Sequence, residues 1–103
     1  MAFEMEIVWS NQARKDYYKV LDYLHENWGL NEVKSFVDKT EEVLGVIKKY
    51  PKTFVESPRK RNIRKGFVTK HNSLFYKVRP YKKEIVLLTF WDNNRQNPKK
   101  LKY

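Results

Sequence analysis

Arginine and lysine side chains dominate the chemistry open to the second half of this sequence. Residues 51–103 hold fifteen Lys or Arg residues against three Asp or Glu, whereas residues 1–50 hold seven against nine. A local excess of one charge attracts the opposite charge and raises encounter rates. We therefore expect this half to bind phosphates or an acidic protein, chiefly through Arg59, Arg61, Arg64, Arg79 and Arg95. Ordinary surface charge that favours solubility is the alternative.

Two other side chains suit roles that arginine does not fill. His71 lies in a predicted turn beside Lys70, and an imidazole with an ordinary pKa of about 6.5 can act as a general acid or base. A solvated turn residue is the alternative. Trp91, near the end of the last predicted strand, is placed to stack on a base or to clamp a partner, and its alternative is to cap the edge of the core.

The composition argues against several other kinds of site. There is no cysteine, which excludes disulfides and thiolate metal sites, and two histidines are too few for the usual zinc sites. We expect neither metal nor cofactor. The first residues carry acid where a signal peptide carries base, and no apolar run approaches the roughly 20 residues of a membrane span. We therefore expect a cytoplasmic protein without a membrane partner.

The elements that would position these side chains follow from the hydrophobic pattern. Residues 4–9 alternate acid and apolar side chains, as a short strand covered on one face does. Apolar positions then recur at steps of three and four from Ala13 to Trp28 and again from Val33 to Tyr50. The glycine at position 29 and the proline at position 51 end the two stretches. Two helices joined so briefly should lie side by side and antiparallel.

After residue 58 the period changes from 3.6 to 2, and aromatic and β-branched residues become frequent in 63–68, 73–78 and 84–91. The intervening turns, 70–72 and 80–83, are short enough for neighbouring strands to pair antiparallel. We expect an α+β fold of order β-α-α-β-β-β, in which a helical hairpin packs on a four-stranded, largely antiparallel sheet. The first strand should lie at an edge of this sheet.

Strict alternation along these strands predicts how the sheet divides its side chains between two faces. One face receives Leu74, Tyr76 and Val78, and the other receives Phe75, Lys77 and Arg79. In the last strand, Val86, Leu88 and Phe90 share one face of the sheet. The face away from the helices would then expose cations and aromatic rings, which indicates a binding surface. Residues 93–103 show neither period, and we expect them to form a flexible tail of a single domain spanning 1–103.

Several segments, spread over nearly the whole chain, resemble the RelE/ParE superfamily of bacterial toxins from type II toxin–antitoxin systems. They are Ile7-Val8-Trp9-Ser10, Ala13, Asp16 through Tyr23, Asn27-Trp28-Gly29, Val43-Leu44 to Pro51, Ile63-Arg64, Leu74-Phe75-Tyr76-Lys77-Val78 and Asp92-Asn93-Asn94-Arg95-Gln96-Asn97-Pro98. The resemblance implies a growth-inhibiting toxin that a cognate antitoxin neutralises, in a hetero-oligomer, by covering its basic surface. It also implies one of two targets, because RelE-like members cut messenger RNA on the ribosome and ParE-like members inhibit DNA gyrase.

The residues expected for RNA cleavage are where this chain departs from that pattern. Cleavage without a metal needs groups that move protons and cations that hold the phosphate. Ribonuclease members usually carry an arginine where this chain has Ser73, and several place histidine or tyrosine where it has Asn93 and Asn94. Because asparagine transfers no proton at neutral pH, we favour gyrase inhibition. The alternatives are a metal-independent mRNA endoribonuclease, in which His71 or Tyr76 moves the proton, and a nucleic-acid-binding module without toxicity.

Overall fold

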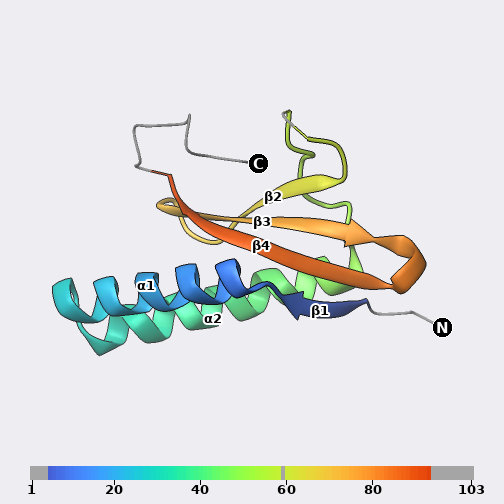
Figure 1. The fold of residues 1–103 in the computed structure, drawn as a ribbon. Helices are drawn as coiled ribbons and strands as arrows, with labels where there is room; N and C mark the ends of the chain where they lie inside the picture. The colour runs from blue at the N-terminus through green and yellow to red at the C-terminus, as the bar shows by residue number, and fades with distance from the viewer. Residues whose placement is uncertain (1–4, 59, 94–103) are drawn as a thin grey trace.

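Two helices pack on one side of a four-stranded sheet (Figure 1). The computed structural model describes residues 5–58 and 60–93. Its elements are β1 (Glu6–Trp9), α1 (Asn11–Asn27), α2 (Leu30–Lys49), β2 (Ile63–Phe67), β3 (Asn72–Arg79), the 3-10 turn η1 (Pro80–Lys82) and β4 (Glu84–Asp92). The expected order β-α-α-β-β-β is confirmed. The expected tail lies outside the described residues from position 94 onward.

Local signals set the ends of the two helices. The hydroxyl oxygen of Ser10 accepts a hydrogen bond from the Ala13 amide at 3.0 Å and so caps the start of α1. The same hydroxyl donates to the Leu88 carbonyl of β4 at 3.2 Å, which ties the helix to the sheet. Gly29 forms the bend before α2 with a φ of 102°, a conformation that L side chains rarely adopt. Across residues 5–58 and 60–93, no helix is both long and apolar enough to cross a membrane.

The strands lie in the order β1-β4-β3-β2, so β1 occupies an edge as expected. β1 runs parallel to β4, and the other two pairs are antiparallel. A short segment before β2 extends the opposite edge, where Glu56 forms a bridge with Arg64. The sheet is therefore largely antiparallel with one parallel pair, in agreement with the sequence-based prediction.

A β-bulge at Leu88 interrupts the alternation of β4. The residues on either side of it, Leu87 and Thr89, pair with consecutive residues of β3. Beyond the bulge the two faces exchange, so that Phe90 lies in the core together with Leu87. The expectation that Val86, Leu88 and Phe90 share a face is therefore wrong.

The core lies between the helical hairpin and the sheet. Its buried side chains come from both helices and from the two central strands, and include Ala13, Phe36, Leu44, Ile47, Leu74, Tyr76, Ile85, Leu87 and Phe90. Burial of apolar surface contributes roughly 25 cal/mol per Å² to folding, so this layer fixes how the helices sit on the sheet. It thereby fixes the turns at both ends of β3, on which the candidate functional residues lie.

Candidate functional site

Cationic side chains gather at one end of the sheet, around the β3–β4 turn. We call this region the basic end and define it by Lys48, Lys49, Arg61, Lys77, Arg79, Lys82 and Lys83. The Val78 amide donates to the Asn62 carbonyl at 3.4 Å, which brings the loop carrying Arg61 beside β3. Figure 1 shows the β3–β4 turn, the start of β1 and the loop before β2 at the same end of the molecule. The basic end therefore holds five of the ten described Lys and Arg residues that follow position 50, together with Lys48 and Lys49.

The N-terminal strand joins the end of α2 to this turn. The amides of Met5 and Glu6, which are consecutive in the chain, donate to the carbonyls of Lys48 and Lys83 at 3.3 and 2.9 Å. Helix and turn are thus brought together through two adjacent backbone donors. This contact adds lysines from the less basic half of the sequence to those of the turn.

Arg64 and Tyr76 point instead at the loop between α2 and β2. Arg64 Nη1 donates to the Phe54 carbonyl at 2.7 Å and lies 3.5 Å from the Lys52 carbonyl. The buried Tyr76 hydroxyl donates to the Pro51 carbonyl at 2.8 Å. Burial raises the pKa of Tyr76 to about 12, although the neighbouring Arg64 charge lowers it. These contacts favour a structural role for both side chains, and their predicted functional roles stay predictions.

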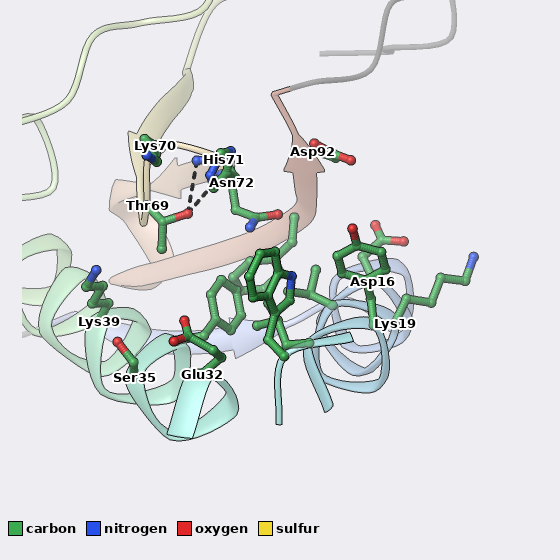
Figure 2. Close-up of a pocket in the computed structure, with 16 residues that line it drawn as sticks. Asp16, Lys19, Glu32, Ser35, Lys39, Thr69, Lys70, His71, Asn72 and Asp92 are labelled. Atoms are coloured by element: carbon green, nitrogen blue, oxygen red, sulfur yellow. Dashed lines mark hydrogen bonds between the residues drawn. The ribbon is translucent and has the colours of Figure 1, made fainter. Parts of the chain in front are cut away.

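A groove of about 850 Å³ lies at the other end of the molecule, between the helical hairpin and the β2–β3 turn (Figure 2). Its apolar lining includes Val20, Leu24, Phe36 and Phe90. Its polar lining carries charges of both signs, from Asp16, Lys19, Glu32, Lys39, Lys70 and Asp92. Two large rings at its margin, Tyr23 and Trp28, are 60% and 69% exposed. The groove thus offers apolar surface to a partner.

His71 lines this groove from the β2–β3 turn (Figure 2). It directly precedes β3, whose other end lies at the basic end. Its amide donates to the Thr69 hydroxyl at 3.1 Å, and its carbonyl accepts from the Asn93 amide at 2.8 Å. The Asn93 side chain accepts a hydrogen bond from the Ser73 hydroxyl at 2.7 Å. Ser73 and Asn93 occupy two of the positions where ribonuclease members carry reactive groups, and here they are joined by a hydroxyl–amide hydrogen bond.

The sheet face away from the helices exposes fewer aromatic rings than alternation predicts. The Lys65 ammonium lies 5.3 Å from the Phe67 ring centre and 5.8 Å from that of Phe75. Phe67 is 58% exposed, but Phe75 is only 3% exposed, so the expectation of an open Phe75 ring is wrong. Trp91 pairs with Ser73 across the strands and is half-buried, and its proposed stacking role stays a prediction.

The structure brings together only part of the predicted arginine set. Arg61 and Arg79 lie at the basic end, and Arg64 binds the loop after α2. Arg59 and Arg95 lie outside the described residues. Within the part of the chain that is described, no group of three His, Asp or Glu side chains is arranged to hold a metal ion.

Sequence reasoning missed two contributions to these surfaces. Lys48 and Lys49 end α2 and join the basic end only through long-range contacts, which leave no local signal. Trp28 falls on the apolar stripe of α1, and its spacing therefore suggested core. Trp28 is the last residue of that stripe, and its place at the end of the helix was the one sign in the sequence that its side chain could be exposed.

Solved structures show which class of protein has this fold. A chain of the chromosomal ParDE TA system from P. aeruginosa matches with a TM-score of 0.69 and 17% identity, covering 87% of this chain and 97% of that one. A chain of the toxin-antitoxin complex RelBE2 from Mycobacterium tuberculosis matches with a TM-score of 0.64 and 13% identity, over 92% and 98%. The isolated E. coli RelE toxin matches with a TM-score of 0.55 and 14% identity, over 90% and 88%. The fold is thus that of RelE/ParE toxins.

A family model then narrows the class. The family described as the ParE toxin of the type II toxin-antitoxin system, parDE, matches residues 7–97. The chain therefore belongs to the ParE toxin family. No curated protein matches the chain significantly.

Proposed function

We propose that this ParE-family toxin inhibits bacterial growth by acting on DNA gyrase and does not cleave RNA. The observation that carries this choice is the separation of the basic end from His71. The eight residues of β3 run from Asn72, next to His71, to Arg79 at the basic end, a distance of about 23 Å at roughly 3.3 Å per residue. A single scissile phosphate cannot contact both. The other candidate, Tyr76, is buried with its hydroxyl bound to a backbone carbonyl.

An mRNA endoribonuclease is the second candidate, and the groove is the observation that favours it. His71 and Lys70 line the groove together, and Lys19 and Lys39 line it from the helices. An imidazole near cations is a suitable combination for acid–base chemistry on a phosphate. This mechanism requires the His71 imidazole, so that His71→Ala would abolish toxicity. Gyrase inhibition predicts that the same variant stays toxic.

The two mechanisms are separated by inducing the gene alone in bacteria and following DNA and protein synthesis after induction. Gyrase inhibition predicts that DNA synthesis stops first, and that the purified protein blocks supercoiling of relaxed plasmid by gyrase. His71→Ala and Tyr76→Phe should behave as the parent protein in both assays. Cleaved mRNA on ribosomes, an early stop in translation and inactive His71→Ala would instead establish the nuclease. A chain that stops neither process is the non-toxic module.

We propose further that a cognate antitoxin seats an apolar segment in the groove. A partner that covers exposed rings in a pocket gains most of its affinity from a few such side chains. Trp28→Ala should weaken binding of the protein encoded by the adjacent reading frame by at least about tenfold. Tyr18→Ala removes a ring of comparable exposure, 58%, that does not line the groove, and serves as the matched control. Equal losses in the two variants would show that the groove is not the docking surface.

A further inference from the structure

Tyr81 stands at the tip of the β3–β4 turn with its whole side chain in solvent, 102% exposed. A single exposed ring is ordinary on a protein surface. In the sequence, however, Tyr81 follows Arg79 by two residues and directly precedes Lys82 and Lys83. Proteins that bind single strands combine cations that follow the phosphates with aromatic rings on which bases stack. We infer that the basic end binds single-stranded nucleic acid, with Tyr81 stacking on a base.

The turn that carries Tyr81 is held in one conformation by backbone contacts. Pro80 fixes the first residue of η1, and its carbonyl accepts a hydrogen bond from the Lys83 amide at 3.1 Å. Lys83 adopts a left-handed conformation, with a φ of 53°, and its carbonyl accepts from the Glu6 amide at 2.9 Å. The backbone therefore has little freedom left to lose on binding, which favours affinity.

The carboxylates near the basic end do not cancel its charge. Glu84 lies 3.9 Å from the Arg79 guanidinium, an exposed pair that screens one cation in part. Glu56 accepts a hydrogen bond from the Asn62 amide at 3.1 Å. Among the described residues, the three acids Glu6, Glu56 and Glu84 are outnumbered by the cations that define the basic end. The excess of cations provides an electrostatic field that attracts a polyanion.

The exposed ring favours a single strand over other polyanions. The bases of a duplex are stacked inside the helix and offer no face to a surface side chain unless the pair is opened. An acidic peptide pairs with the cations and does not require an aromatic face, so poly-glutamate serves as the competing polyanion in the test. Stacking also tolerates any base, so the interaction should have little sequence preference. This inference does not depend on gyrase as the target.

Binding is measured by fluorescence polarisation with the purified full-length chain at several salt concentrations. The probes are a labelled single-stranded DNA of about 12 nucleotides, the RNA of the same sequence and the corresponding DNA duplex. Binding of either single strand supports the proposal, and the tighter of the two identifies the preferred sugar. Each phosphate contact contributes about 0.7 to the log-log salt slope. The double variant Lys82→Ala/Lys83→Ala should therefore lower that slope by about 1.4. The control Lys15→Ala/Lys34→Ala removes equal charge from exposed helix positions outside the groove and should leave the slope unchanged.

The stacking step is tested separately from the charge. Tyr81→Ala should weaken single-strand binding by roughly five- to a hundredfold with the same salt slope, and Tyr81→Phe should restore it. Because the ring is fully exposed, both variants should keep the parent melting temperature. Absence of single-strand binding at low salt would overturn the inference. Equal affinity for the duplex or for poly-glutamate would also overturn it, because either result would show that the surface binds any polyanion through charge alone.

Discussion

Replacing Tyr76 with phenylalanine removes one hydroxyl and leaves the packing of the ring intact. The hydroxyl donates to the Pro51 carbonyl at 2.8 Å. A hydrogen bond of this kind contributes about 1 kcal/mol to stability. Tyr76→Phe should therefore lower the free energy of unfolding by about 1 kcal/mol at neutral pH.

The effect of the same substitution should reverse in alkali. Burial raises the pKa of Tyr76 from 10.0 to about 12, so the folded protein keeps a proton that the unfolded chain has lost. This contribution to stability is complete below pH 10 and is lost as the pH rises from 10 to 12. Two pKa units correspond to a loss of about 2.7 kcal/mol in the free energy of unfolding of the parent protein. The Tyr76→Phe protein, which has no such hydroxyl, does not undergo this loss. The free energies of unfolding of the two proteins should therefore cross between pH 10 and pH 12.

The assay is urea unfolding followed by tryptophan fluorescence, repeated from pH 7 to pH 12. Every other ionisable group is common to the two proteins, so the difference between the two curves isolates Tyr76. A difference that stays constant over this range would refute the raised pKa. Loss of toxicity in a stable Tyr76→Phe protein would refute the structural role and favour proton transfer.

Three further substitutions test contacts that position the site. Gly66→Ala places a methyl group 3.3 Å from the Phe54 ring, and we expect a loss of about 1 kcal/mol in urea unfolding; unchanged stability would show that the ring yields freely. Ser73→Ala and Asn93→Ala each remove their shared hydrogen bond, so a double-mutant cycle should give a coupling of about 0.5 to 1 kcal/mol, and additive losses would contradict that contact. Ser10→Ala removes a helix cap and should lower stability by about 1 kcal/mol, measured as a lower melting temperature, whereas Ser10→Thr should keep most of it; equal losses would disprove the cap.

The order of elements could be predicted because each signal is local. Helical spacing, turn residues and strand alternation are all visible within a few neighbouring positions. The bulge in β4 has no such local signal in the sequence. It lies where α1 crosses the strand, and there the Thr89 hydroxyl donates to the Asp16 carboxylate while Ser10 donates to the Leu88 carbonyl. Residues so distant in sequence meet only in the folded chain, so strict alternation failed at this point.

The charge of the site could be predicted, but its membership could not. The excess of Lys and Arg after residue 50 indicated a basic region, and Arg61 and Arg79 do lie together. Arg64 differs because its neighbours include backbone carbonyls of the loop, which every residue carries and no pattern reveals. Lys48 and Lys49 lie in the last turn of α2, where cations interact favourably with the helix dipole, so nothing in their local sequence ties them to the basic end.

The distance between the groove and the basic end constrains how an antitoxin would neutralise this toxin. The groove borders the β2–β3 turn, whereas Tyr81 lies beyond the other end of β3, about 23 Å away along the strand. A helix confined to the groove would leave the cations uncovered. An extended chain advances about 3.3 Å per residue, so roughly seven more residues would reach the basic end, and acidic side chains there would complement its charge. An antitoxin that lacks such a segment would leave single-strand binding intact in the complex, and one that carries it would abolish that binding.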